Sequence, residues 1–376
     1  MDFLPSFPPI HFGRGSLKKL KAWLHATSSR RPLLITDQGL SKVGTVDRVK
    51  DLLEPEITLV TFTGICENPT IDCVENALRI YRKFQCDSVI GLGGGSVLDA
   101  GKALRIITHQ NLSLLEYLQN PSHISYNVAP YATIPTTAGT GAEITFGGGI
   151  HAVQNGPPLG LRSEFLRPDI AFCDPELTLT LPPKLTAATG MDALIHCLEG
   201  YLSTTVNIPA EAIALDGIQR VSNFVVRATT DGSDMEARTN MLMAAVEGGM
   251  SIYMGLGPVH ALSIAFGDSP LHHGTLVTVC APSVLKRFEN LPEEKLSNVV
   301  TAMGLGSAPR PALAIADRIL ELNKKLGLPS TVKEMDYDGA SFDELVETAS
   351  SNWFNKTSPK QLSIKEYESI ISELLS

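Results

Sequence analysis

Residues 88–107 read SVIGLGGGSVLDAGKALRII, and this stretch decides the fold. Ser88–Leu92 is an apolar run typical of a buried strand, and Val97–Ile107 shows the apolar spacing of a helix. The glycine cluster between them, Gly91–Ser96, is a tight turn from strand to helix. Glycines let backbone N–H groups approach an anion closely, and the helix N-terminus adds a partial positive charge. The turn therefore predicts a pyrophosphate site, with a plain turn capped by Ser96 as the alternative.

The glycine cluster departs from two common phosphate-binding patterns. Ser96 stands where a G-x-G-x-x-G motif has its last glycine, and no Gly-Lys-Ser/Thr follows as a Walker loop requires. A second loop, IPTTAGTGAE at residues 134–143, follows another predicted strand. Its three threonines, Thr136, Thr137 and Thr140, are candidates to bind ribose or phosphate oxygens, and a solvated loop is the alternative.

Asp37 directly follows the first predicted strand, Pro32–Thr36. A carboxylate at this place can accept hydrogen bonds from ribose hydroxyls and repels a 2′-phosphate, which favours NAD over NADP. The alternative for Asp37 is a local one, a helix N-cap or an Asx-turn within Thr36-Asp37-Gln38-Gly39.

Strand and helix patterns alternate through the first half of the chain. Further strands are expected at Ile57–Phe62, Pro130–Ile134 and Ile170–Cys173, and helices at Val46–Leu53 and Ile71–Phe84. Strands separated by helices of this length indicate βαβ units, and therefore a parallel sheet covered by helices. We expect residues 1–177 to form an α/β dinucleotide-binding domain.

After residue 177 the helical pattern continues with almost no strand signal. The predicted helices are Ala187–Leu202, Ala210–Ala228, Asp234–Tyr253, Leu271–Phe288, Ala312–Leu326, Phe342–Ser350 and Ile364–Leu375. We expect residues 178–376 to form an all-α domain. A chain of 376 residues agrees with two domains of ordinary size.

Composition excludes several classes of protein. The net charge of −9 argues against a nucleic-acid binder, which needs Lys and Arg to neutralise phosphates. No apolar run approaches the roughly 18 residues of a membrane span. The start, Met1–Pro5, lacks the basic and apolar segments of a signal peptide, which predicts a cytoplasmic protein. The six cysteines form no C-x-x-C pair, so we expect free, mostly buried thiols in a reducing compartment.

Asp192 and His196 form the first part of a possible metal site. They are four residues apart in a strongly helical pattern, so both side chains lie on one helix face and can share a cation. Their neighbours are apolar, and a buried charge without a partner is costly. Further ligands are available from His260 and from the pair His272-His273. One Asp with up to three His suits Fe²⁺ or Zn²⁺ better than Mg²⁺ or Ca²⁺, and a surface Asp/His pair is the alternative.

Several motifs in a fixed order resemble one family. They are GGGSVLDAGK at 93–102, PTTAGTGAE at 135–143, DPELT at 174–178, and TGMDALIH at 189–196 followed by EGY at 199–201. The chain resembles the iron-containing, or group III, alcohol dehydrogenases, which are related to glycerol dehydrogenase and dehydroquinate synthase. The similarity runs from Phe12-Gly13-x-Gly15 almost to the C-terminus. The resemblance implies a dehydroquinate-synthase-like fold, with an α/β nucleotide domain and an all-α metal domain.

The resemblance also implies the roles of individual residues. The metal ligands would be Asp192, His196, His260 and His273. The NAD-binding residues would be Asp37, Gly93, Gly94, Gly95, Ser96, Thr136, Thr137 and Thr140. The implied reaction is reversible hydride transfer between a small alcohol and nicotinamide, with Fe²⁺ or Zn²⁺ as a Lewis acid. Asp99 and His272 are the candidate catalytic residues, and the family's habit of dimerising, often through N-terminal strands, predicts a homodimer.

The chain departs from the family at the position of a proposed proton relay. A further histidine often stands four residues after the third metal ligand, and here that position is Ile264. The interval from His260 to His273 is also one residue short. His272 is a candidate replacement for the relay, or alternatively the ligand in place of His273.

Three other functions are set against the alcohol dehydrogenase. A metal-independent reductase of the maleylacetate reductase type is disfavoured because all four candidate ligands are present. A dehydroquinate-synthase-like lyase needs several Lys and Arg to hold a phosphorylated substrate, and no such cluster lies near the histidines. A non-catalytic nucleotide-binding protein would have lost the metal ligands.

Overall fold

The computed structural model describes residues 6–109, 111–154, 156–289, 291 and 293–376. Residues Met1–Pro5, on which the signal-peptide argument rests, lie outside this range. Internal contacts divide the chain into two compact units. We call Ser6–Thr137 with Ala142–Thr180 the sheet unit, and Ala138–Gly141 with Leu181–Ser376 the helical unit. The domain boundary at residue 177 remains a proposal.

The sheet unit is built on a six-stranded parallel sheet. Its strands are β1 (Ile10–Phe12), β2 (Pro32–Ile35), β3 (Val60–Phe62), β4 (Ser88–Gly93), β5 (Tyr131–Pro135) and β8 (Ile170–Cys173), and β6 (Gly147–His151) pairs with β7 (Pro158–Arg162) as a separate antiparallel ribbon. The order in the parallel sheet is β1-β8-β5-β4-β2-β3. The predicted α/β class with a parallel sheet is therefore confirmed.

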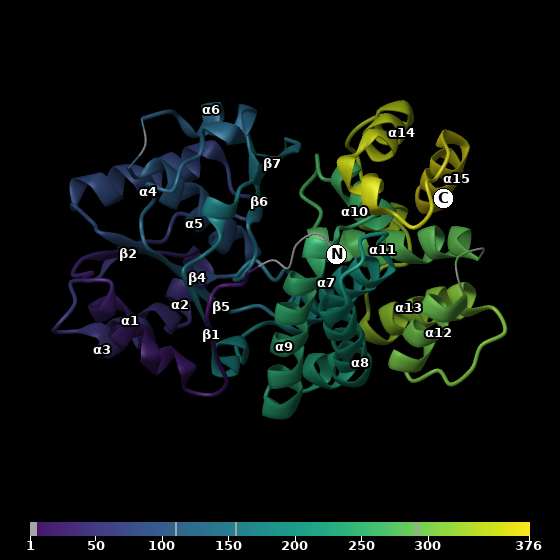
Figure 1. Cartoon of the computed structure of the whole chain (residues 1–376), viewed down its shortest axis with the longest axis horizontal. Coiled ribbons are helices and arrows are strands. Elements are labelled where there is room, and N and C mark those ends of the chain that lie inside the picture. The colour runs from purple at the N-terminus through teal and green to yellow at the C-terminus, as the bar shows by residue number, and fades with distance from the viewer. Residues whose placement is uncertain (1–5, 110, 155, 290, 292) are drawn as a thin grey trace. The chain divides into compact units, whose positions relative to one another are not determined.

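Helices cover both faces of this sheet. They are α1 (Leu20–Ala26), α2 (Gln38–Lys42), α3 (Thr45–Leu53), α4 (Ile71–Lys83), α5 (Gly95–Ile107) and α6 (Leu114–Gln119). Side chains of β2 alternate between two cores: Leu33 and Ile35 pack with α4, α5 and α6, while Leu34 packs with α1 and α3. Figure 1 shows α4, α5 and α6 on the side of the sheet away from α1 and α3. Burial on both faces explains why the strands read as continuous apolar runs.

The strand order changes direction between β2 and β4. The chain places β3 on one side of β2 and then returns to place β4 on its other side, with β5 beyond. In open parallel sheets, the carboxyl ends of the strands at such a switch point form the crevice that binds a ligand. Asp37 and the glycine cluster follow these two strands.

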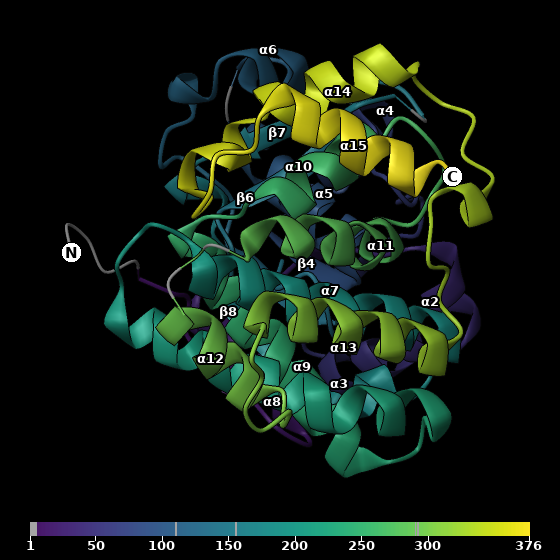
Figure 2. The ribbon, with the colours of Figure 1, turned by 90° about the vertical axis from the view of Figure 1, so that its right-hand side faces the viewer.

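The helical unit consists of helices joined by loops, and no strand occurs among the residues described for it. They are α7 (Pro183–Leu202), α8 (Ile208–Thr230), α9 (Met235–Ser251), α10 (Pro258–Ala265), α11 (His273–Leu285), α12 (Glu293–Ala302), α13 (Pro311–Leu326), α14 (Phe342–Ser351) and α15 (Ile364–Leu374). Figure 2 shows α7 and α11 in the interior of this group. From Thr186 to Leu202, α7 is buried throughout, because nearly all its residues are apolar or small. Its buried carboxylates and imidazole are those of Asp192, Glu199 and His196.

Several predicted element boundaries were wrong, each for a local reason. Strand β3 starts at Val60 rather than Ile57, because the amide of Ile57 closes the end of α3 by bonding the carbonyl of Leu53. Helix α5 begins at Gly95 with Gly94 as its N-cap, so Ser96 lies inside the first turn. Helix α11 begins at His273 rather than Leu271.

Two features relevant to the whole chain agree with expectation. All six cysteines are free, and five of them are buried. Within the described residues, no helix is both long and apolar enough to cross a bilayer.

Candidate metal centre and nucleotide-binding edge

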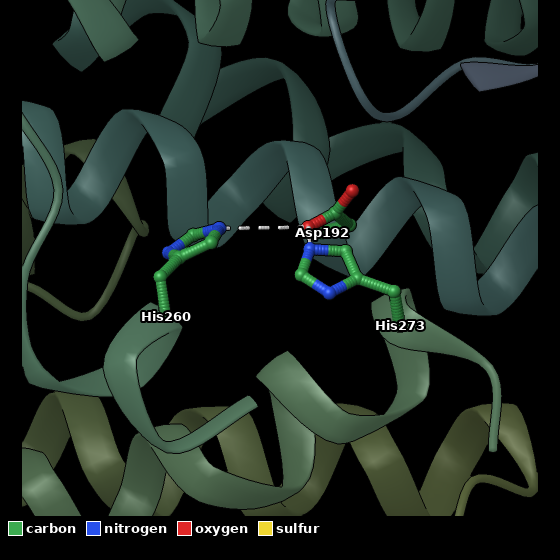
Figure 3. Close-up of side chains that lie close together, drawn as sticks. All are labelled: Asp192, His260 and His273. Carbon is green, nitrogen blue, oxygen red and sulfur yellow. Dashed lines mark ion pairs between the residues drawn. The ribbon is translucent and has the colours of Figure 1, made fainter. Parts of the chain in front are cut away.

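Three histidines of the helical unit converge on one oxygen of Asp192. Helix α7 supplies Asp192 and, one turn later, His196, whose Nε2 lies 3.7 Å from Oδ1 of Asp192. His260 from α10 and His273 from α11 each place Nε2 3.9 Å from the same oxygen. Figure 3 shows the rings of His260 and His273 approaching Asp192 from different segments. Ligand atoms of Asp192, His260 and His273 all lie within 4.8 Å of one another, and His196 falls outside that closer group.

The polar atoms at this cluster fit a divalent cation. Oδ1 of Asp192 and Nε2 of His260 are buried without a hydrogen-bond partner. Leaving such atoms unpaired in the interior costs about 1–3 kcal/mol each, so a bound ligand is expected to satisfy them. Metal–ligand bonds of about 2.1 Å in a tetrahedral site put ligand atoms about 3.4 Å apart, and the three Nε2 atoms lie slightly farther than this, 3.7–3.9 Å, from Oδ1 of Asp192. The donor set, imidazole with one carboxylate, suits Fe²⁺ or Zn²⁺.

Two imidazoles of this cluster, those of His196 and His273, are held in the neutral form that binds metals. Burial, with added repulsion from His260, keeps the pKa of His196 well below its usual range. Although 41% of the side chain of His273 is exposed, the surrounding protein desolvates the imidazolium enough to lower its pKa to about 4, against an opposing attraction from Asp192. A neutral ring keeps a lone pair for coordination.

Glu199 orients His260, and sequence reasoning assigned it no role. Its carboxylate accepts a hydrogen bond from Nδ1 of His260 at 2.6 Å and another from the amide of Val259 at 2.8 Å. With Nδ1 donating to Glu199, Nε2 of His260 is free to face Asp192. Glu199 stands three residues after His196 on α7, so its helical spacing was a signal that could have been used.

We predict that Glu199→Gln lowers metal affinity 10- to 100-fold, because the uncharged amide weakens the hold on His260. The measurement is metal retained against a competing chelator. Glu247→Gln is the matched control, since Glu247 is also a buried glutamate of the helical unit, on α9. Equal metal retention in the two variants would contradict a role for Glu199 in the site.

His272 and His273 occupy different positions at the start of α11. His272 is the N-cap, with an extended backbone, and His273 is the first helical residue. His273 is the one whose Nε2 faces Asp192, so the geometry favours it as the ligand. Nδ1 of His272 is buried without a hydrogen-bond partner. Its role as a relay in place of a histidine at Ile264 stays a prediction.

Phe354 also reaches the metal cluster, and no sequence pattern indicated it. Its ring meets the ring of His260 edge to face, with centroids 6.1 Å apart. Two of the hydrogen bonds that fix the surrounding segment, Trp353–Thr357, come from distant parts of the helical unit: Thr357 donates to the carbonyl of Leu256, and Tyr367 of α15 donates to Oδ1 of Asn355. An apolar ring therefore borders one of the candidate ligands.

In the sheet unit, the candidate nucleotide residues gather at the carboxyl ends of three adjacent strands. Asp37 follows β2, Gly94 follows β4, and Thr136 with Thr137 follow β5. The methyl group of Thr137 lies 3.0 Å from where a Cβ on Gly94 would stand, so only glycine fits there without a shift. The amide of Thr136 bonds the carbonyl of Gly93 at 3.0 Å.

The N-terminus of α5 lacks a side-chain cap. Its N-cap, Gly94, provides no side chain, whereas α2 is capped by Asp37 and α4 by Thr70. The amides of Gly95 and Ser96 open this 13-residue helix. Such amides, together with the helix dipole, favour an anion. Asp37 caps α2 through the amide of Leu40, the local alternative weighed from the sequence.

Asp99 and Lys102 connect α5 to β6. Nζ of Lys102, almost completely buried, donates to Oδ1 of Asp99 at 3.0 Å, to Thr145 at 2.9 Å and to the carbonyl of Gly147 at 2.7 Å. Oδ2 of Asp99 accepts from the amide of Gly149. These contacts hold the strand next to the helix, and a catalytic role for Asp99 stays a prediction.

Thr140 belongs to the helical unit, within Ala138–Gly141, so its part in a nucleotide site also stays a prediction. This segment packs on α7: a Cβ on Gly139 would stand 2.6 Å from Cβ of Thr189.

Family models match both parts of the chain. The model described as "Iron-containing alcohol dehydrogenase" matches residues 8–175, and "Fe-containing alcohol dehydrogenase family, C-terminal" matches residues 186–375. The chain belongs to the iron-containing alcohol dehydrogenase family. It is accordingly an oxidoreductase of the alcohol dehydrogenase type, as the sequence motifs predicted.

Individual relatives extend over the whole chain. The 4-hydroxybutyrate dehydrogenase of Cupriavidus necator is 36% identical over 386 residues, which cover 99% of this chain and 100% of that protein. Alcohol dehydrogenase 4 of Schizosaccharomyces pombe is 32% identical and covers 99% and 88%. Among solved structures, a 1,3-propanediol oxidoreductase has a TM-score of 0.92 at 28% identity and covers 100% of both chains. The sulfoacetaldehyde reductase of Bifidobacterium kashiwanohense, solved with NAD⁺, shares the fold with a TM-score of 0.91, at 24% identity over 100% of this chain and 99% of that chain.

Proposed function

We propose that this member of the family is a metal-dependent, NAD(H)-linked alcohol dehydrogenase and aldehyde reductase acting on small alcohols. The observation that carries the proposal is the convergence of three imidazole Nε2 atoms on one unpaired oxygen of Asp192. A divalent ion held there by Asp192, His196, His260 and His273 would supply Lewis acidity toward the alcohol or aldehyde oxygen. Fe²⁺ and Zn²⁺ both suit these ligands, and the family name favours iron.

The residues of the sheet unit support NAD(H) as the second reactant. The nicotinamide supplies the hydride acceptor or donor. Gly93, Gly94, Gly95 and Ser96 would hold the pyrophosphate through backbone amides, and Thr136, Thr137 and Thr140 would add hydroxyls. Asp37 would bond the adenosine ribose with its carboxylate and repel a 2′-phosphate, which favours NAD over NADP.

Proton handling is assigned to residues of this chain. His272, whose Nδ1 is buried and unpaired, is the candidate relay for the proton that the alcohol loses. Asp99 would act through Lys102, by keeping that ammonium and β6 in place.

Assembly and location are two further parts of the proposal. We propose a homodimer that meets through β1, because β1 is an edge strand and edge strands offer unpaired backbone groups. We propose a cytoplasmic location, because six free thiols suit a reducing compartment.

The proposal is tested by NADH oxidation at 340 nm with a panel of small aldehydes, under anaerobic conditions with Fe²⁺ present. The panel includes simple alkanals and an aldehyde bearing a terminal carboxylate, since the substrate of the Cupriavidus necator relative bears one. Turnover with at least one small aldehyde is expected, and the best substrate defines the pocket. If no aldehyde supports NADH consumption, the proposed activity is wrong.

A further inference from the structure

Cys66 and Cys73 form a pair of neighbouring thiols in the sheet unit. Cys66 lies in the loop after β3, and Cys73 lies in the first turn of α4. Burial and the adjacent thiol of Cys66 together raise the pKa of the Cys73 thiol to about 11. Sγ of Cys73 lies 3.2 Å from the carbonyl oxygen of Thr70, and Sγ of Cys66 lies 3.9 Å from that of Asn68. Both thiols therefore face the same short loop.

The two thiols differ in exposure. Cys66 is partly exposed, whereas Cys73 and the other four cysteines are buried. Cys66 is thus the thiol that a small solute reaches first, and Cys73 is the thiol next to it. Stepwise oxidation to a disulfide requires an accessible thiol that is oxidised first and a neighbouring thiol that then attacks it, and Cys66 and Cys73 fit these two roles.

The segment that carries these cysteines is hydrogen-bonded both to Thr36, at the end of β2, and to His151 in β6. On one side, the amide of Ile65, next to Cys66, bonds the carbonyl of Thr36, which precedes Asp37. On the other side, the amide of His151 in β6 bonds the carbonyl of Pro69 at 2.8 Å, and Thr70 forms an isolated bridge with His151. Strand β6 is the one held by Asp99 and Lys102. The contact with Thr36 connects this segment to Asp37, the next residue and a candidate nucleotide ligand.

We propose that Cys66 and Cys73 are an oxidisable dithiol, which a hydroperoxide converts to a disulfide that weakens nucleotide binding. In the first step, the sulfur of Cys66 attacks the peroxide, an S–O bond forms, the O–O bond breaks, and water leaves when hydrogen peroxide is the oxidant. In the second step, the sulfur of Cys73 attacks the sulfenic acid, the S–S bond forms, and a second water leaves. Two thiols lose two electrons and two protons, and the peroxide is reduced to two waters.

The disulfide changes the loop because its bond is short. An S–S bond of about 2.05 Å is shorter than any non-bonded contact between two sulfurs, so closure draws Cys66 and the start of α4 together. Ile65 is the neighbour of Cys66 and is bonded to Thr36, so Thr36 and then Asp37 move with it. Because few thiolates form at a thiol with a pKa of about 11, the second step is slower than the attack of an ordinary thiol.

The first arm of the test is chemical and needs no cofactor. The protein is treated with hydrogen peroxide, its thiols are alkylated, and peptides are mapped by mass spectrometry. We expect a mass loss of about 2 Da, a crosslinked peptide joining Cys66 to Cys73, and reversal by dithiothreitol. Cys66→Ser and Cys73→Ser should each abolish the crosslink. Cys86→Ser, at another buried cysteine of the sheet unit, should keep it.

The crosslink proposal is overturned if Cys66 is oxidised to a sulfinic acid, or forms a disulfide between chains, while Cys73 stays reduced.

The second arm measures the Kd of NADH by its fluorescence and rests on the proposed cofactor. Oxidation should raise this Kd about tenfold in the wild type and leave it unchanged in Cys73→Ser. An unchanged Kd in the crosslinked wild type refutes the effect on binding. If the reduced protein does not bind NADH, the proposed cofactor is wrong. The mass-spectrometry arm then still shows whether Cys66 and Cys73 form a disulfide.

Discussion

Asp192→Asn is expected to remove bound metal and to lower kcat/KM for aldehyde reduction by about 10³-fold, with NADH affinity kept. Asp192 is the residue on which all three Nε2 atoms converge, and the amide keeps its volume while removing its charge. A Lewis acid at a substrate oxygen contributes several kcal/mol, and each 1.36 kcal/mol is about tenfold in rate. The measurements are metal content by elemental analysis and steady-state kinetics on the same preparation.

Asp216→Asn is the matched control for this variant. Asp216 is a carboxylate on α8 that pairs with Arg220, so the substitution removes the same charge from the helical unit outside the metal cluster. It should keep its metal and its activity within a few-fold. If Asp192→Asn retains metal and turnover like the control, Asp192 is not a ligand and the proposed metal centre is wrong.

Gly94→Asp is expected to raise the Kd of NADH about 100-fold while leaving metal content unchanged. The new Cβ would stand 3.0 Å from the methyl group of Thr137, and its carboxylate would lie where the amides of α5 would meet a pyrophosphate. Both the lost space and the negative charge of the aspartate oppose binding of the pyrophosphate. A 100-fold increase in the Kd of NADH corresponds to about 2.7 kcal/mol. The measurement is NADH fluorescence titration, with circular dichroism to show that the variant folds.

Two further variants separate charge from position. Asn76→Asp adds the same charge to an exposed position of α4 and should leave NADH binding unchanged. Gly94→Ala adds only the methyl group and should raise the Kd less than the aspartate does. If Gly94→Asp binds NADH as tightly as Asn76→Asp, the glycine cluster does not hold the pyrophosphate.

The elements that the sequence predicted correctly are those whose structure depends on residues close together in the chain. The strand, turn and helix of residues 88–107 depend on local spacing, so β4 and α5 appeared within one or two residues of the expected bounds. The ribbon of β6 and β7 was not predicted, because β6 begins Gly147-Gly148-Gly149 and glycine is a poor strand former. Helix α10 was also missed, since its sequence PVHALSIA is apolar apart from His260 and Ser263 and shows no alternation of apolar and polar faces.

The residues of the candidate site also divide into those that local spacing predicted and those that it did not. Asp192 and His196 were found from spacing on one helix, and Glu199 was available from the same spacing. His260 and His273 were assigned through the family resemblance, because they come from separate helices and no spacing relates them to Asp192. Phe354 lies beside His260 only through the path of the chain between α14 and α15, which no local pattern records.

The most direct test of the metal centre is to remove the metal and then replace it. The purified protein is dialysed against a chelator, its metal content is measured, and NADH-dependent aldehyde reduction is followed before and after addition of Fe²⁺ or Zn²⁺. We predict about one metal ion per chain, loss of turnover in proportion to metal removed, and its return with the correct ion. Undiminished turnover in the metal-free protein would contradict the account and identify a metal-independent reductase.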